Sequence, residues 1–226
     1  MHRKPFSGPR ISLILLVLLA LLPALGLILY NGYEQRQVAI HQVQDEAQQI
    51  THLISEDYDR AVMGTRQVLT AISRVEAVAS QDPEKCSQFM QRLLPQFDQY
   101  ANFGVADLDG NIYCSAVPMA KPVNISDRHY FQNAIRERSF APGEFQIGRI
   151  TGKPTMNFGY PLLGTDDTAY GVIFAAVDLN WLVALSAETM LPAGASFTLI
   201  DSQGAVLGRY PNPEAWMGKT ITDTDL

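Results

Sequence analysis

The stretch NFGVADLDGNIYCSA, residues 102–116, decides the fold class, because two short apolar runs flank a turn in it. Residues 102–107 indicate a buried strand, and residues 112–116 indicate a strand that returns beside it. Between them, Asp107 and Gly110 belong to a run of residues that favour tight turns. The stretch therefore predicts a β-hairpin.

The same local pattern occurs a second time near the end of the chain. VADLDGNI at residues 105–112 and LIDSQGAV at residues 199–206 both place an apolar pair before Asp-x-x-Gly and an apolar return after it. We interpret the pair as a repeated domain type. A single hairpin is not stable alone, so residues 191–226 are expected to be the start of a second, truncated domain.

Between the two hairpins, the sequence predicts one short helix and three strands. The helix is expected to open at Ser126-Asp127, since apolar residues follow at helical spacing. The strands are expected at residues 143–150, 155–162 and 170–178. Two strands, a helix and three strands predict an α+β domain over residues 81–190, with a five-stranded antiparallel sheet and helices on one side.

Upstream of the first hairpin, the pattern changes to that of helices. Asp82-Pro83-Glu84 is typical of a helix start, and that helix is expected to end near Leu94. Before it, one long amphipathic helix is predicted from about Glu34 to Val78, within a stalk of residues 31–80. One face of the stalk could be plain core, or it could pair with a second copy in a homodimer. Its apolar positions, three or four residues apart, are Val43, Ala47, Ile50, Ile54, Tyr58, Ala61, Thr65, Val68, Ile72 and Val75.

Residues 11–30 form an uncharged apolar run that is long enough to span a bilayer core as a helix. A cleaved signal peptide is the alternative, but its apolar region is shorter, about 7–15 residues. Residues 1–10 carry Arg3, Lys4 and Arg10 and no acid. The positive-inside rule therefore predicts a cytoplasmic N-terminus, a transmembrane helix over residues 11–30, and residues 31–226 on the periplasmic side of a bacterial inner membrane.

The charge balance of the outer part argues against one class of partner. All 23 Asp and Glu but only 14 of the 17 Lys and Arg follow residue 30, so 14 minus 23 leaves a net charge of −9 there. Nucleic-acid binding needs a basic surface. The sequence therefore predicts no nucleic-acid partner.

The chain has two cysteines, Cys86 and Cys114, and both follow the predicted membrane span. They could be buried free thiols. The oxidising compartment and the even count instead favour one disulfide between them.

No motif of catalysis or metal binding is present. The sequence holds no P-loop, no Cys-x-x-Cys, no His-Glu-x-x-His and no Gly-x-Ser-x-Gly. The four histidines are scattered, and two of them lie in the predicted stalk. We therefore expect no catalytic residue, no metal and no cofactor in these 226 residues.

Several motifs, in this order, resemble the double Cache sensors of bacteria, which are tandem PAS-like domains outside the cytoplasm. The first hairpin is followed by Ser126-Asp127-Arg128-His129-Tyr130-Phe131, which is similar to the pocket helix of that family. Thr151-Gly152-Lys153-Pro154 is similar to its turn, and residues 171–179 to its closing strand. Arg209-Tyr210-Pro211, Trp216 and Gly218-Lys219 resemble the start of its second module.

The resemblance implies a small ligand in the membrane-distal module, bearing a carboxylate or an amine. Arg128 would hold a carboxylate in bidentate fashion, Tyr130 and Phe131 would form aromatic walls, and Asp178 would take an amine. Asp178 could equally be the N-cap of the next helix, and Arg128 could pair only with its neighbour Asp127. Tyr130 and Phe131 could be ordinary core residues.

The resemblance also implies a role in signal transduction across the membrane, with the output domain beyond residue 226. The motif set looks most like the sensor portion of a diguanylate cyclase. The alternatives are the sensor of a histidine kinase or a chemoreceptor, and an anchored binding or scaffold protein without an output domain.

Overall fold

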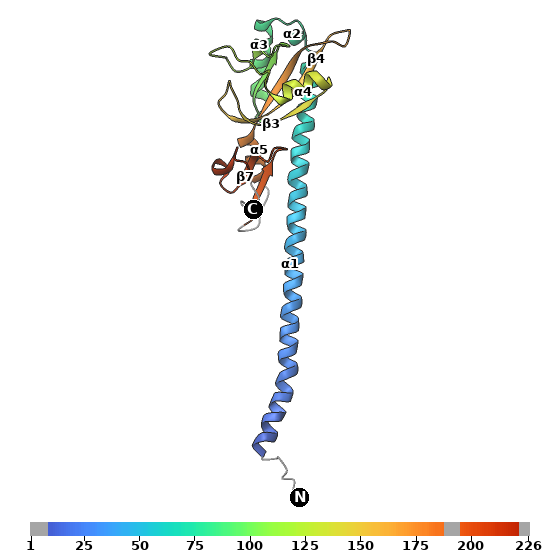
Figure 1. Ribbon diagram of the computed structural model, residues 1–226, viewed down its shortest axis with the longest axis vertical. Coiled ribbons are helices and arrows are strands. Elements are labelled where there is room, and N and C mark those ends of the chain that lie inside the picture. Colours follow the sequence, from blue (N-terminus) through green and yellow to red (C-terminus); the bar gives the residue numbers. More distant parts are fainter. Residues whose placement is uncertain (1–8, 188–194, 222–226) are drawn as a thin grey trace. The chain divides into compact units, whose positions relative to one another are not determined.

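The computed structural model describes residues 9–187 and 195–221, and the chain divides into two units, Met1–Leu53 and Ile54–Leu226. Arg3, Lys4 and residues 191–194, where the second domain is expected to start, lie outside the described residues. Helix α1 is Pro9–Ile72 (Figure 1). It is long and apolar enough to cross a membrane, with a mean hydropathy of 2.5 over its most apolar window and none of that window buried.

The long helix ends earlier than its apolar spacing predicts. The helix is expected to reach about Val78, but α1 stops at Ile72 and a separate helix α2, Glu76–Ala79, follows. The Val75 N–H donates to the Ile72 carbonyl at 3.0 Å. This hydrogen bond spans three residues, as in a 3-10 helix, and tightens the last turn. Val75 itself is extended, so the chain changes direction and buries Val78 completely. Packing of Val78 in the core thus competes successfully with continuation of the helix.

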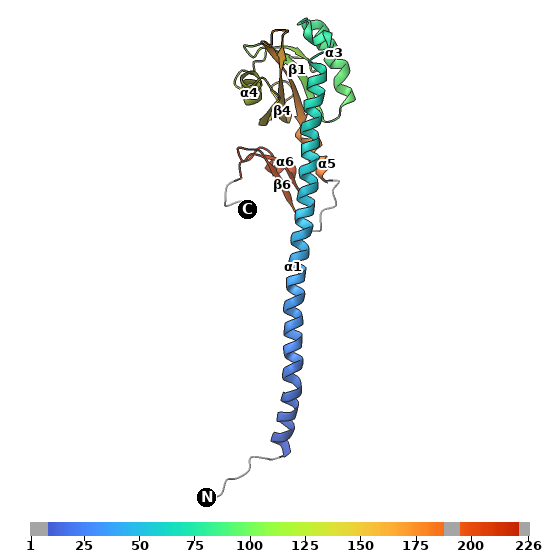
Figure 2. The ribbon, with the colours of Figure 1, turned by 90° about the vertical axis from the view of Figure 1, so that its right-hand side faces the viewer.

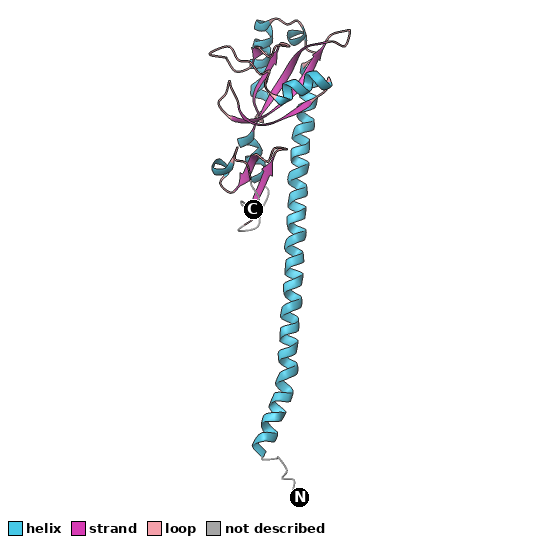
Figure 3. Ribbon diagram, in the orientation of Figure 1, coloured by secondary structure: helices cyan, strands magenta, loops and turns pink. Residues whose placement is uncertain are grey.

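The predicted five-stranded antiparallel sheet is present (Figure 3). Its strands lie in the order β2-β1-β5-β4-β3, so the first hairpin pairs with the last strand of the domain. Every neighbouring pair in it is antiparallel. The strands are β1 Tyr100–Ala106, β2 Ile112–Ser115, β3 Ala141–Ile147, β4 Pro154–Leu163 and β5 Ala169–Asp178.

Helices cover both faces of the sheet, which corrects the expectation that they lie on one side. In β1, Phe103 and Val105 pack into the core cluster that contains α3, Pro83–Leu93, and the end of α1. Ala106 belongs to the cluster on the opposite face, beneath α4, His129–Glu137. Figure 2 shows the sheet between α3 and α4. The reason is that β1 and β5 are buried along almost their whole length, so both sets of alternating side chains need a cover.

Helix α3 begins as its sequence predicts. The Asp82 carboxylate accepts the backbone N–H groups of Glu84 and Lys85 at 3.1 and 3.2 Å, and Pro83 is the first helical residue. The helix ends at Leu93 and a short 3-10 turn, η1 Leu94–Gln96, follows.

The predicted disulfide is present and ties α3 to β2. Cys86 and Cys114 are bonded, their Cα atoms lie 5.8 Å apart, and neither side chain is exposed. The bond closes a long loop, which stabilises the fold chiefly by restricting the unfolded chain.

Helix α4 begins three residues later than predicted. The Ser126 hydroxyl donates to the Asn124 side-chain oxygen at 2.7 Å, so it belongs to the preceding turn and caps no helix. Arg128 remains extended, with φ −85° and ψ 132°, and helical geometry starts at His129. Residues 126 and 127 therefore form the approach to the helix rather than its first turn.

Glycines let α4 approach the sheet closely. A Cβ atom on Gly159 of β4 would lie 2.6 Å from the Tyr130 backbone oxygen, and one on Gly143 of β3 would lie 3.0 Å from the Tyr130 ring. These distances are shorter than van der Waals contact. Glycine at these two positions therefore allows α4 to pack closely on the strands.

The second hairpin follows α5, Leu179–Ala187, and consists of β6, Phe197–Ile200, and β7, Val206–Tyr210. Its turn repeats that of the first hairpin. Asp201 N donates to Ala205 O and Ala205 N donates to the Asp201 carboxylate, both at 2.9 Å. Asp107 makes the corresponding two bonds with Asn111, at 3.0 and 2.8 Å.

The repeat extends beyond the two hairpins, which the sequence pattern does not show. After the first hairpin the chain returns, so that Ile112 N donates to Val123 O and Ile125 N donates to Gly110 O. After the second it does the same, with Val206 N donating to Lys219 O and Ile221 N donating to Gly204 O. Residues 195–221 thus reproduce the backbone path of the first module over more than its hairpin.

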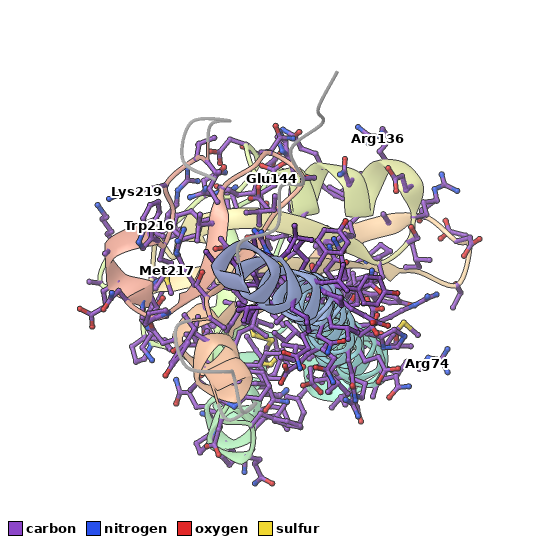
Figure 4. The ribbon with its side chains drawn as sticks, turned by 90° about the horizontal axis from the view of Figure 1, so that it is seen from below. Arg74, Arg136, Glu144, Trp216, Met217 and Lys219 are labelled. Carbon is purple, nitrogen blue, oxygen red and sulfur yellow. A yellow bond between two sulfur atoms is a disulfide. The ribbon has the colours of Figure 1, made fainter. Side chains whose placement is uncertain are left out.

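The second-module motif residues come together around Trp216. Helix α6, Pro213–Trp216, brings this ring under the Arg209 guanidinium, which lies 4.0 Å from the ring centroid. Lys219 lies 5.6 Å from the same ring (Figure 4). This cation–π arrangement stabilises the segment that follows β7.

The packing at Gly159 gives a direct test of the fold. We expect Gly159→Ala to lower the free energy of unfolding by about 1–3 kcal/mol, because the added carbon meets backbone that cannot move without displacing α4. Urea unfolding followed by tryptophan fluorescence measures this change. Gly64→Ala is the matched control: Gly64 is helical with open space around its Cβ position, so the change should raise stability by up to about 1 kcal/mol. Equal effects at the two positions would contradict the close packing.

Candidate ligand-binding site

A small, open pocket lies on the α4 face of the sheet. Its floor is formed by β1, β4 and β5. Its walls are formed by the start of β2, the loop before α4, the first turn of α4, the end of β3 and the β3–β4 connection. The floor residues are Asn102 of β1, Asn157 of β4, and Phe174 and Ala176 of β5. The wall residues are Ile112, Val123, Ile125, Arg128, Tyr130, Gln146, Gly148, Arg149, Ile150 and Thr151.

Arg128 is a half-buried cation in the wall of this pocket. It stands at the last extended residue before α4, so its side chain leaves the backbone where the helix begins. Its guanidinium makes no hydrogen bond and no ion pair with any residue that the structure describes. The alternative in which Arg128 pairs with its neighbour Asp127 is therefore not observed, and Asp127 pairs with Arg149 instead.

The partner of Asp127 is Arg149, from the β3–β4 connection. The two side chains form a bidentate pair with both nitrogen–oxygen distances at 2.7 Å, and Arg149 also donates to the Asn124 carbonyl at 2.6 Å. The hydrogen bond from Arg149 lowers the pKa of the Asp127 carboxyl, and the same bond raises the pKa of Arg149. The pair fastens one end of the β3–β4 connection to the approach of α4.

Tyr130 and Asn157 form the polar interior of the pocket. Tyr130 is almost fully buried, and burial raises the pKa of its hydroxyl to about 12, so the phenol stays neutral. The Asn157 amide donates to the Tyr130 oxygen at 3.4 Å. The other end of that amide, the Asn157 Oδ1 atom, is buried and has no hydrogen-bond partner within the described chain.

The other two predicted ligand residues do not line the pocket. Phe131 is buried in the apolar cluster beneath α4, where it packs as an ordinary core residue. The Asp178 carboxylate lies at the end of β5 and bonds to Lys153 Nζ at 2.9 Å and to the Asn180 N–H at 3.0 Å. It therefore acts as the predicted cap of α5 and also forms an ion pair that the sequence did not indicate.

The comparison with known families matches residues 34–223 to a family model described as a Cache domain. That range covers most of the chain. The chain belongs to the Cache domain family. The α+β fold, the five-stranded antiparallel sheet and the resemblance drawn from the motifs are confirmed at this level.

Solved sensor domains share this Cache fold at low sequence identity. The extracellular domain of rpHK1S-Z16, assigned as a histidine kinase, has a TM-score of 0.71 at 20% identity and covers 81% of this chain and 76% of its own. The sensor domain of the Vibrio cholerae histidine kinase DctB has a TM-score of 0.64 at 17% identity, covering 79% and 70%. The ligand-binding domain of the Pseudomonas aeruginosa amino acid chemoreceptor PctC, in complex with GABA, has a TM-score of 0.61 at 16% identity, covering 78% and 79%.

One curated protein is similar over a comparable range. Sporulation kinase D of Bacillus subtilis is 18% identical over 168 residues, which are 74% of this Cache chain. The match spans only 33% of that kinase.

Three residues of the site escape sequence reasoning, and each depends on a contact between distant elements. Arg149 precedes the turn that the motif comparison singles out and Lys153 lies within it, but their partners lie on other elements. Asn157 sits in an apolar strand pattern, and a polar residue there is the signal that could have drawn attention to it. No group of three or more His, Cys, Asp or Glu residues in the described part of the chain could hold a metal ion.

The Asp127–Arg149 pair should make stability depend on pH. The folded pKa of Asp127 is depressed below its unfolded value near 3.9, so the pair stabilises the fold above about pH 4 and is lost as pH falls further. Both side chains are more than one third exposed, which limits the effect to about 1 kcal/mol or less.

Thermal unfolding near pH 6 should therefore show a lower melting temperature for Asp127→Asn than for the unaltered protein, and near pH 2.5 the difference should vanish. Arg149→Gln, which removes the other half of the pair, should show the same pH-dependent loss. A difference that persists undiminished at the lower pH would contradict the assignment.

Proposed function

We propose that this Cache domain binds a small molecule bearing a carboxylate and passes the binding event to an output domain across a membrane. The observation that carries the proposal is Arg128, a half-buried guanidinium in the pocket wall without an ion-pair partner among the described residues. A guanidinium matches a carboxylate in geometry and charge. The neutral Tyr130 hydroxyl beside it supplies a further hydrogen-bond donor.

The similar structures support this class of ligand. PctC is solved with GABA, and the Pseudomonas fluorescens chemoreceptor CtaA with L-serine. Both molecules carry a carboxylate. The proposal assigns the role of carboxylate partner to Arg128 and that of pocket wall to Tyr130, whereas Phe131 supports the wall from the core.

The N-terminal segment is proposed to anchor the domain. Residues 11–30 would span the inner membrane, with residues 1–10 in the cytoplasm and residues 31–226 outside, because the basic residues precede the span. The disulfide is consistent with an oxidising compartment.

Alkaline phosphatase fused after residue 221 should be active, and the same enzyme fused after residue 10 should be inactive, since it folds only outside the cytoplasm. The reverse result would exclude this orientation.

The motif set supports a diguanylate cyclase as the whole protein. The curated relative and two of the similar structures instead favour a histidine kinase as a second candidate. Assaying the full-length protein for cyclic di-GMP synthesis and for autophosphorylation on histidine separates the two.

In either case we propose a homodimer through the stalk of α1, where Val43, Leu53 and Met63 are apolar and exposed. Sedimentation of the chain as a monomer in detergent would exclude the dimer.

The ligand proposal is tested by removing the Arg128 charge. Arg128→Gln should weaken binding of a carboxylate ligand by about tenfold or more, because a charge-assisted hydrogen bond contributes about 1.5–3 kcal/mol. The shift of the melting temperature with added carboxylates, recorded for the full chain in detergent, measures this. Arg136→Gln is the matched control: Arg136 is an exposed arginine in the last turn of α4 (Figure 4) and pairs with Glu137. If the two variants respond alike, Arg128 does not hold the ligand.

A further inference from the structure

Lys153 pairs with Asp178, the acid at the end of β5, at 2.9 Å. In a strand, side chains alternate between faces, so Asp178 shares a face with Phe174 and Ala176, which form the pocket floor. Asp178 is 8% exposed, and both of its oxygens are engaged, one by Lys153 and the other by the Asn180 N–H. The acid nearest to the floor along β5 is therefore neutralised by the protein's own lysine.

The pocket lining offers no anion. It contains two arginines and no aspartate or glutamate. Asp127 lies at its border but forms the bidentate pair with Arg149. A ligand ammonium would thus enter next to the unpaired Arg128 cation and find no counter-charge, and burying an uncompensated charge is strongly unfavourable.

The pocket does hold a hydrogen-bond acceptor that lacks a donor. Asn157 is 5% exposed, its Nδ2 group donates to Tyr130, and its Oδ1 atom is buried without a partner in the part of the chain that the structure describes. Buried polar atoms are nearly always paired in folded proteins. A ligand hydroxyl can supply the missing donor without adding positive charge.

We propose that this pocket selects small carboxylates that carry a hydroxyl over the matching amino acids, and that the Lys153–Asp178 pair sets this preference. The proposal rests on the proposed function, because it takes Arg128 as the partner of the ligand carboxylate. Arg128 and the Tyr130 hydroxyl hold the carboxylate, and Asn157 Oδ1 accepts the hydroxyl of the ligand. Lys153 determines specificity by keeping Asp178 from an ammonium group.

Matched ligand pairs test the preference. L-lactate and L-alanine differ only by hydroxyl against ammonium, as do L-malate and L-aspartate, and succinate lacks both groups. Calorimetric titration of the full chain in detergent micelles should give a dissociation constant about tenfold or more lower for at least one hydroxy acid than for its amino acid. Succinate should bind more weakly than malate.

Lys153→Met tests the part played by the lysine. It keeps the apolar stem and frees the Asp178 carboxylate, so the affinity for the amino acid of the preferred pair should rise about tenfold. The double variant Lys153→Met, Asp178→Asn should lose that gain, because the freed carboxylate is gone. Lys121→Met removes an exposed lysine that does not line the pocket and should change neither affinity. Circular dichroism establishes that each variant is folded.

The possible outcomes separate the two proposals. If amino acids bind the unaltered chain as tightly as hydroxy acids, the specificity inference is wrong and the carboxylate proposal stands. If Lys153→Met leaves the preference unchanged, the lysine does not set it. If none of the five ligands binds, or if binding survives Arg128→Gln, the proposed function itself fails.

Discussion

The antiparallel pairing of β1 with β5 is the constraint on which the rest of the domain depends. Both strands are buried along nearly their whole length, so each must satisfy two faces at once. Phe103 and Ile173 face the core beneath α3, whereas Asn102 and Phe174 face the pocket beneath α4. Because side chains alternate between the two faces of paired strands, a shift of one residue would exchange core and pocket. The core and the binding site therefore share one register.

Sequence reasoning succeeded where the signal is local. The Asp-x-x-Gly turns, the cap at Asp82 and the apolar runs of the strands all act within a few residues, and the structure confirms them. It failed where a distant contact decides. α1 ends at Ile72 rather than near Val78 because Val78 packs in the core. The spacing of apolar residues along the helix contains no information on that packing.

The candidate site shows the same division. Arg128 and Tyr130 were predicted from a motif, and the pocket includes both. Asp178 was predicted as a ligand contact, but its charge is already paired with Lys153. That pair joins two segments whose proximity follows from the pairing of β4 with β5, where Thr155 faces Asp178. Only the folded sheet therefore tells which charges of the motif remain available to a ligand.

The closing of β5 onto β1 also has a consequence in time. The two Asp-x-x-Gly hairpins are held by bonds within five residues, and such turns form within microseconds. The β1–β5 pairing instead joins strands that are separated in sequence by β2, α4, β3 and β4. Long-range pairings of this kind slow folding. The pocket, whose floor spans both strands, should thus be among the last features to form as the chain emerges from synthesis.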